Sequence, residues 1–276
     1  MKFGELIDKR HRKIPFASWI AEAPKAQVYV LHGYAEHFRR YDRFAQNLNL
    51  AGYSVHAFDL PGHGAAEGRR GHIDSFQDYI DSLLWFIEEN PNREENLPTF
   101  LFGHSMGALI SAHMVIQKQQ HLQGLILGSP LTGFGGLLSS AGWALAKFLG
   151  RNQPDRLIPK PLDPKDLTHL EWRHPEYTSD PLRLTTLSPA LFLGMLSWSD
   201  LLHKNAHLLK IPLLVFYSRA DQVVNPLKIE AFFRAVKSRD KELVAFSQAG
   251  HEILNDKEEG QMTEKITAWI AQHLPT

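Results

Sequence analysis

Short, almost wholly apolar runs alternate along most of this chain with longer segments whose apolar residues recur at helical spacing. Runs of the first kind are typical of strands buried on both faces of a sheet, whereas spacing of three and four residues marks one face of a helix. The predicted strands span residues 3–8, 14–20, 28–31, 54–60, 99–102, 124–127, 213–218 and 243–246, and the predicted helices span 38–51, 75–89, 108–119, 227–236 and 262–273. This alternation predicts an α/β fold with a mostly parallel, doubly wound sheet.

The alternation is interrupted between residues 130 and 210, where no convincing core strand occurs. Two helix-like pieces, 137–149 and 189–202, flank a proline-rich stretch. We therefore expect a core formed by residues 1–129 and 211–276, with residues 130–210 inserted as a helical cap. The apolar stretch 131–150 contains five glycines and Lys147, so it is too polar and too glycine-rich for a good membrane span.

A candidate nucleophile lies where the predicted strand 99–102 gives way to the predicted helix 108–119. The sequence there is Gly103-His104-Ser105-Met106-Gly107, a Gly-x-Ser-x-Gly pattern. The pattern alone is a weak signal, but between a strand and a helix it indicates a sharp turn that presents the serine hydroxyl at a helix N-terminus. Backbone N–H groups and the helix dipole favour developing negative charge there. We therefore interpret Ser105 as a nucleophile.

A serine nucleophile needs a base, and the base needs an acid that orients it. In this topology the order along the chain is serine, acid and histidine, each after a strand. Asp221 follows the strand 213–218, and His251 follows the last strand. The chain has 15 histidines, so position rather than abundance selects His251. Asp256 is the fallback acid, but it comes after the base in the chain.

An oxyanion hole is the second part of such a site. We expect its donors to be the backbone N–H of Met106, next to the nucleophile, and that of Tyr34, in the loop after strand 28–31. Gly33 would let the backbone approach a substrate carbonyl. The alternative is that His32 and Gly33 form a plain turn, and their place at the end of a central strand argues against it.

Together these segments resemble the serine α/β-hydrolase superfamily, and more narrowly its monoacylglycerol lipase and lysophospholipase group. The resemblance rests on residues 32–37 (HGYAEH), 40–41 (RY), 59–64 (DLPGHG), 67–68 (EG), 70–76 (RGHIDSF), 103–107 (GHSMG), Asp221 and 250–251 (GH). These blocks cover nearly the whole chain apart from the cap. One departure is Ala66, where the group often has serine, and it affects local loop packing rather than catalysis.

The resemblance implies an α/β-hydrolase fold and cleavage of ester bonds in single-acyl lipids through an acyl-serine intermediate, without metal or cofactor. It implies monoacylglycerol as the substrate, with lysophospholipids or simple carboxylic esters as alternatives. A non-catalytic ligand-binding protein on the same fold is disfavoured, because a catalytically inactive relative usually lacks one of the three candidate catalytic residues. Here all three are present.

The cap is expected to hold the acyl chain, as in the group that the chain resembles. Candidate residues are Leu138, Trp143 and Phe148 in its first helical piece and Phe192 and Met195 in its second, together with Gly33 of the core. The alternative is that these side chains only seal the cap onto the core. The cap is also a candidate for peripheral contact with a membrane.

The amino-acid composition limits which binding partners and which catalytic chemistry we expect. The net charge is zero, so nothing indicates a nucleic-acid partner. The absence of cysteine excludes disulfides, thiol catalysis and cysteine-ligated metal. The first residues carry charges and no continuous apolar segment, so we expect no signal peptide and a cytoplasmic location. The sequence does not specify an oligomeric state.

Overall fold

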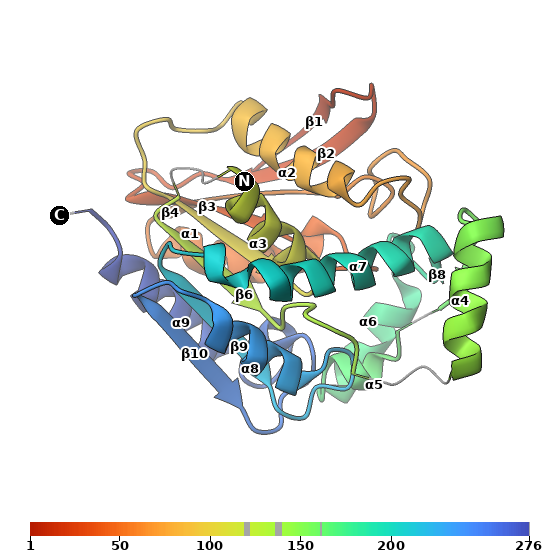
Figure 1. Ribbon diagram of the computed structural model, residues 1–276. Coiled ribbons are helices and arrows are strands. Elements are labelled where there is room, and N and C mark those ends of the chain that lie inside the picture. The colour runs from red at the N-terminus through yellow and green to blue at the C-terminus, as the bar shows by residue number, and fades with distance from the viewer. Residues whose placement is uncertain (119–121, 136–139, 161, 276) are drawn as a thin grey trace.

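The centre of the fold is an eight-stranded β-sheet (Figure 1). The structure is a computed structural model that describes residues 1–118, 122–135, 140–160 and 162–275. Across the sheet the order is β1 (Lys2–Ile7), β2 (Lys13–Trp19), β4 (Tyr53–Phe58), β3 (Ala26–Leu31), β5 (Thr99–His104), β6 (Gly124–Gly128), β9 (Leu213–Ser218) and β10 (Lys241–Phe246). Strand β2 runs antiparallel to both of its neighbours, and the other adjacent pairs are parallel. The predicted mostly parallel α/β fold is confirmed.

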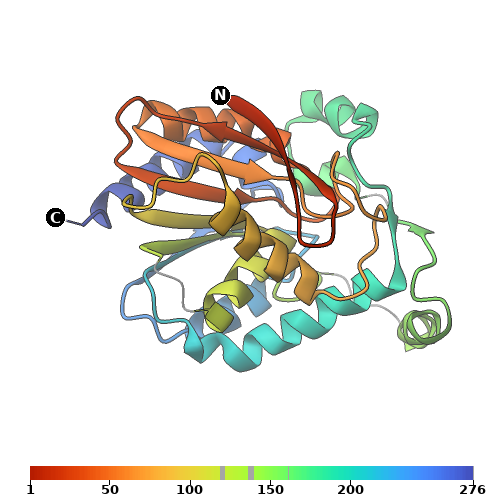
Figure 2. The ribbon, with the colours of Figure 1, turned by 90° about the horizontal axis from the view of Figure 1, so that it is seen from above.

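Helices cover both faces of the sheet, as Figures 1 and 2 show. One face carries α1 (Asp42–Leu50) and α9 (Glu259–Gln272), and the other carries α2 (Gln77–Glu89), α3 (Met106–Lys118) and α8 (Pro226–Ala235). Alternate residues of β5 point to opposite layers, with Leu101 in one core cluster and Phe100 and Phe102 in the other. Because both faces are buried, the strand needs apolar residues at every position, which is why its sequence is a continuous run.

Residues 130–210 fold into two parts that pack differently. The segment contains α4 (Ser140–Asn152), β7 (Ile158–Pro159), α5 (Pro164–Leu167), α6 (His174–Ser179), β8 (Thr186–Leu187) and α7 (Pro189–Asn205). Strands β7 and β8 pair with each other, outside the main sheet. Helix α7 buries Leu191, Met195 and Leu202 in the same core cluster as α2 and α3. Helix α4 instead lies at the margin of the molecule, and Figure 2 views it almost end-on.

Helix α7 has a capped N-terminus, whereas α4 is notable for the apolar side chains that it exposes. Ser188 caps the N-terminus of α7 by accepting a hydrogen bond from the backbone N–H of Leu191, and Pro189 occupies the first turn. In α4, Leu145 and Phe148 are 57% and 59% exposed. Among the described residues, no helix combines the length and the apolar character needed to cross a membrane.

Candidate active site

The turn at Ser105 has the geometry that its glycines allow. Ser105 has φ +52°, in the left-handed region that non-glycine residues rarely adopt. A Cβ on Gly107 would lie 2.4 Å from the carbonyl oxygens of Leu31 and His32, and one on Gly103 would lie 2.6 Å from the carbonyl oxygen of Gly107. Side chains at these two positions would push the strand and the helix apart. Glycine therefore lets α3 begin directly after the serine, at Met106.

The three predicted catalytic side chains lie together and are hydrogen-bonded in series. His251 Nε2 lies 2.9 Å from Ser105 Oγ, and His251 Nδ1 lies 2.7 Å from Asp221 Oδ2. Ser105, Asp221 and His251 are 7%, 5% and 2% exposed. With a carboxylate at Nδ1, that nitrogen carries the proton, and Nε2 is left to accept one from the serine hydroxyl.

Separate contacts hold the two carboxylates of the acid and base loops. Asp221 Oδ1 accepts hydrogen bonds from the backbone N–H groups of Val223 and Val224, at 2.8 and 3.0 Å. These bonds keep the other carboxylate oxygen aimed at the imidazole. The fallback acid, Asp256, instead accepts from the backbone N–H of Gly250 at 2.6 Å and pairs with His169. Asp256 therefore shapes the loop before His251 rather than orienting its ring.

The loop after β3 lies directly against the nucleophile. A Cβ on Gly33 would lie 3.1 Å from Ser105 Cβ. His32 Nε2 accepts a hydrogen bond from the backbone N–H of Leu60 at 2.9 Å, and its Nδ1 lies 2.8 Å from the carbonyl oxygen of Gly33. Burial lowers the pKa of His32, so it supports the loop as a neutral ring. Tyr34 follows Gly33 in this loop and Met106 follows Ser105, and their role as oxyanion donors remains a prediction.

A buried polar cluster behind His251 was not identified from the sequence. Glu36 Oε1 lies 2.8 Å from His104 Nδ1, and Glu36 Oε2 accepts a hydrogen bond from the Tyr41 hydroxyl at 2.6 Å. His104 Nε2 lies 3.3 Å from the carbonyl oxygen of His251, and the two imidazole centroids are 4.9 Å apart. A carboxylate at one nitrogen and a carbonyl oxygen at the other require both nitrogens of His104 to donate, which describes an imidazolium.

The electrostatics of this cluster agree with that protonation. Burial alone would lower the pKa of His104, but the Glu36 carboxylate outweighs it and raises the pKa to about 8. Burial would likewise raise the pKa of Glu36, whereas His104 and Arg40 hold it well below its ordinary value. Both residues lie in motifs that the sequence already shows, since Glu36 belongs to the segment 32–37 and His104 directly precedes Ser105. Their pairing across 68 residues could not be deduced from either motif alone.

The segment 130–210, which the sequence predicts to be a cap, holds the backbone of the loop that carries His251. The backbone N–H of His251 donates to the carbonyl oxygen of Asp166 at 3.1 Å, just as Glu252 donates to Leu167 at 2.9 Å. The Glu252 carboxylate also accepts from Arg40 at 2.9 Å and from the Tyr177 hydroxyl at 2.7 Å. Residues of α5 and α6 therefore help to hold the loop of the candidate base, a contact that no motif in the sequence indicates.

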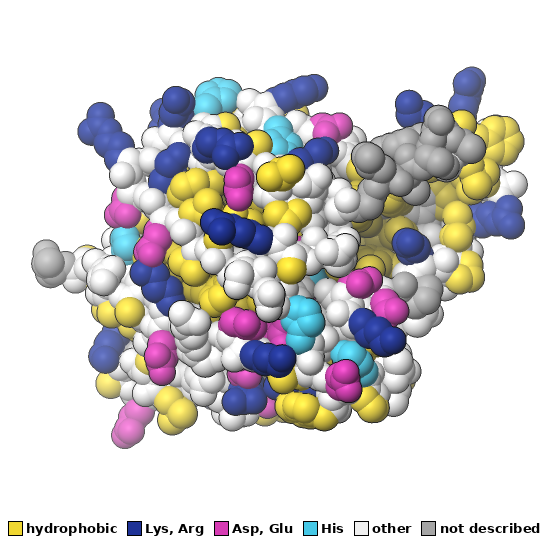
Figure 3. Space-filling view, turned by 90° about the horizontal axis from the view of Figure 1, so that it is seen from below, with side chains coloured by type: hydrophobic (Ala, Val, Ile, Leu, Met, Phe, Trp, Pro, Cys, Tyr) yellow, Lys and Arg dark blue, Asp and Glu magenta, His cyan; other side chains and the backbone are white. Residues whose placement is uncertain are grey.

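The predicted cap residues lie in different surroundings. Phe148 is exposed on α4. Phe192 and Met195 both belong to α7: Phe192 is half-buried, with its ring centroid 5.4 Å from that of Phe134, and Met195 is buried in the core cluster. Leu138 and the side chain of Trp143 lie outside the described residues. Figure 3 shows a hollow with hydrophobic side chains in its walls beside α4.

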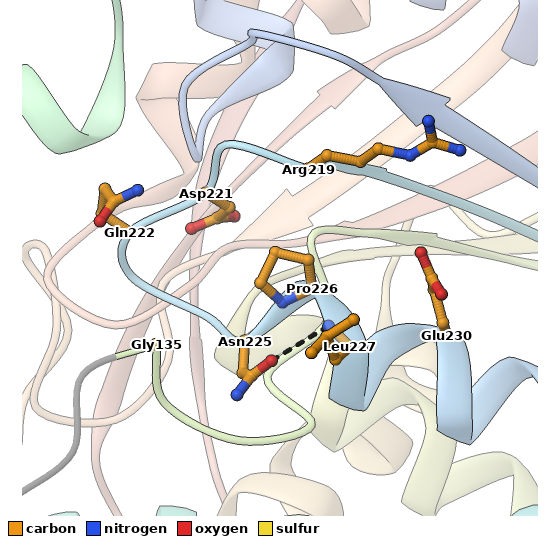
Figure 4. Close-up of a pocket in the computed structure, with 8 residues that line it drawn as sticks. All are labelled: Gly135, Arg219, Asp221, Gln222, Asn225, Pro226, Leu227 and Glu230. Atoms are coloured by element: carbon orange, nitrogen blue, oxygen red, sulfur yellow. Dashed lines mark hydrogen bonds between the residues drawn. The ribbon is translucent and has the colours of Figure 1, made fainter.

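A separate pocket of about 490 Å³ lies between the acid loop and the start of α8 (Figure 4). Its lining residues are Gly135, Arg219, Asp221, Gln222, Asn225, Pro226, Leu227 and Glu230. Ser105 and His251 do not line it, and the Asp221 side chain is fully buried. The pocket is therefore not where the nucleophile meets a substrate. Within the described ranges, no three histidine, aspartate or glutamate side chains are grouped to hold a metal ion.

Comparisons with known proteins place this chain in a family. Residues 22–258 match the model of the family described as serine aminopeptidase, S33. Phospholipase YtpA of Bacillus subtilis is 30% identical over 93% of this chain and 99% of its own length, and the monoacylglycerol lipase of Mycolicibacterium smegmatis is 27% identical over 95% and 94%. The crystal structure of Paleococcus ferrophilus monoacylglycerol lipase matches with a TM-score of 0.84 and 31% identity, over 99% of this chain and all of that one. These matches confirm the resemblance and the α/β-hydrolase fold, and the chain belongs to the serine aminopeptidase S33 family.

Proposed function

We propose that this chain is a serine carboxylester hydrolase that cleaves single-acyl lipids such as monoacylglycerol to a fatty acid and glycerol. The observation that carries the proposal is the unbroken hydrogen-bonded series from Ser105 through His251 to Asp221. It lies at a strained turn and at the N-terminus of a buried helix, where an attacking alkoxide and a tetrahedral oxyanion are both stabilised. Relatives named as monoacylglycerol lipases support the choice of substrate.

The reaction runs in two halves. Ser105 Oγ attacks the ester carbon while His251 Nε2 takes its proton, and the carbonyl oxygen becomes an oxyanion that the N–H groups of Tyr34 and Met106 bind. The C–O bond to glycerol then breaks, and His251 returns the proton to the leaving alcohol. Water, deprotonated by His251, attacks the acyl-Ser105 ester; as the bond between the acyl carbon and Ser105 Oγ breaks, His251 returns the proton to Ser105 Oγ and the fatty acid is released. Asp221 stabilises the imidazolium in both halves.

The cap region of this proposal consists of residues 130–210 over a core formed by 1–129 and 211–276. We assign the acyl chain to the apolar hollow beside α4 and propose that Phe192 of α7 contacts it. The substrate-binding roles expected for Gly33, Leu138, Trp143 and Met195 remain predictions from the sequence. The exposed Leu145 and Phe148 form an apolar surface on α4, and Lys147 and Arg151 lie beside them. We propose that this surface contacts the membrane that supplies the substrate.

A lysophospholipid is the second candidate substrate. The relative named phospholipase YtpA favours it. The cap also presents exposed cations that could meet a phosphate head group: Lys147, Arg151, Arg156, Lys160 and Lys165. A general carboxylesterase that takes only short soluble esters is the remaining alternative.

A substrate panel with the purified wild type and Ser105→Ala tests the proposal. It should contain p-nitrophenyl esters of increasing acyl length, monoacylglycerols and lysophosphatidylcholine. We expect turnover that depends on Ser105 and is fastest on monoacylglycerol. A preference for lysophosphatidylcholine would select the second candidate, and cleavage of short esters alone would select the third. Full activity in Ser105→Ala would refute the mechanism, and no turnover in the wild type would favour a binding protein.

A further inference from the structure

The dipeptide Gly128-Ser129, at the end of β6, is hydrogen-bonded to all three catalytic segments. The carbonyl oxygen of Gly128 accepts from the backbone N–H of Ser105 at 2.9 Å. The backbone N–H of Ser129 donates to the carbonyl oxygen of Phe216 at 2.8 Å, in the strand that leads to Asp221. The Ser129 hydroxyl donates to the carbonyl oxygen of His251 at 2.8 Å. Two adjacent residues therefore connect the backbones of nucleophile, acid strand and base.

Ser129 occupies a backbone conformation that serine adopts at a cost. Its φ is +41°, in the left-handed region where glycine is the unstrained residue. The side chain is fully buried, so its hydroxyl is not available to water or to substrate. A strained serine at a position that suits glycine indicates that the hydroxyl itself is needed.

The peptide groups on both sides of His251 are held from opposite directions. On the cap side its N–H donates to Asp166, and on the core side its carbonyl oxygen accepts from Ser129. His104 is the second donor to that oxygen, at the longer distance of 3.3 Å. The bond from Ser129 is the shorter of these two side-chain contacts, and holding the backbone at this oxygen helps to set where the imidazole lies between Ser105 and Asp221.

We infer that Ser129 is a positioning residue for the proposed hydrolysis: its hydroxyl, bound to the main-chain carbonyl of His251, holds the imidazole in line between Asp221 and Ser105. The inference rests on the proposed function for its catalytic meaning. Ser129 itself contacts neither the substrate nor a catalytic side chain, and it acts only through the backbone of His251.

Three variants separate positioning from folding. Ser129→Ala removes the hydroxyl and keeps the backbone strain, whereas Ser129→Gly removes both. Ser82→Ala is the matched control, because Ser82 is also buried and its hydroxyl donates to a carbonyl oxygen, that of Asp78 at 2.7 Å, within α2. Each variant is measured for kcat and KM on a p-nitrophenyl ester, for thermal unfolding, and for the rate at which a fluorophosphonate labels Ser105.

We expect both Ser129 variants to lose on the order of 10- to 100-fold in kcat and in labelling rate, with KM nearly unchanged, because the hydroxyl aligns the imidazole and contacts no substrate. Ser129→Gly should be more stable than Ser129→Ala and equally slow. Ser82→Ala should keep the wild-type kcat. The downfield proton resonance of His251 Nδ1–H should shift or broaden in the Ser129 variants and stay unchanged in the control.

Two results would overturn the inference: wild-type labelling rates in Ser129→Ala, or recovery of activity in Ser129→Gly in step with its stability. Labelling and the proton resonance need no lipid substrate, so they test the inference separately from the substrate class. If the fluorophosphonate failed to label the wild-type protein at all, the proposed function would be wrong; the His251 Nδ1–H resonance would then still decide the positioning, and an unchanged resonance in Ser129→Ala would overturn the inference.

Discussion

Raising the pH from 6.5 to 9 should destabilise this protein through the buried pair of His104 and Glu36. In the folded state the pKa of His104 is raised to about 8, compared with about 6.5 in an unfolded chain. A raised pKa means that the folded state binds the proton more tightly. The resulting stabilisation is fully present below about pH 6.5 and is lost as the pH rises through about 8.

The magnitude follows from the two pKa values of His104. Their difference corresponds to about 2 kcal/mol of unfolding free energy. Less than half of this stabilisation is lost by pH 7, and nearly all of it by pH 9. His104 and Glu36 are each 5% exposed, so solvent screening should reduce the effect little.

The assay is urea unfolding of the wild type and of His104→Gln at several pH values between 6 and 9. Other titrating groups largely cancel in the difference between the two proteins, including His56, His63 and His113, whose pKa values burial lowers to about 4, 3 and 4. We expect the stability advantage of the wild type to shrink by about 2 kcal/mol across this range.

The readout is the pH dependence and not the absolute stability, so a general loss of stability in His104→Gln does not obscure it. Glu36→Gln provides a second variant, because without the carboxylate the pKa of His104 should fall and the same pH dependence should disappear. A constant difference between wild type and His104→Gln from pH 6 to 9 would refute the reasoning.

Two further predictions concern backbone packing and the cap surface. Gly107→Ala should prevent folding, because its Cβ would lie 2.4 Å from two backbone carbonyl oxygens. Gly260→Ala, with nothing within 4 Å, should instead stabilise α9 by up to about 1 kcal/mol. Circular dichroism melts of both variants test this, and a normal melt for Gly107→Ala would contradict it. Replacing the exposed Leu145 and Phe148 together by serine should slow hydrolysis of monoacylglycerol in vesicles several-fold and leave a soluble p-nitrophenyl ester unaffected. Equal loss on both substrates would argue against membrane contact.

The sequence by itself determined the fold class and the identity of the candidate triad. Fully buried strands require apolar residues at every position, so their runs could be recognised locally. Ser105, Asp221 and His251 could be selected because a parallel sheet places the carboxyl end of every strand at the same edge, and the three residues follow three strands in the required order. Gly103 and Gly107 marked the sharp turn, because the close approach of backbone there excludes a side chain.

Only the tertiary structure decided which residues support that triad. The partners of His251 outside the triad are Ser129, His104 and the carbonyl of Asp166, which come from three segments far apart in the chain. Contacts of this kind leave no periodic signal, since each depends on how loops from different strands meet. The sequence also could not distinguish α7 from α4, because both segments have the apolar spacing of a buried helix. In the structure α7 packs into the core and α4 lies outside it. Burial depends on the surface that each helix contacts, and that surface is formed only when the chain folds.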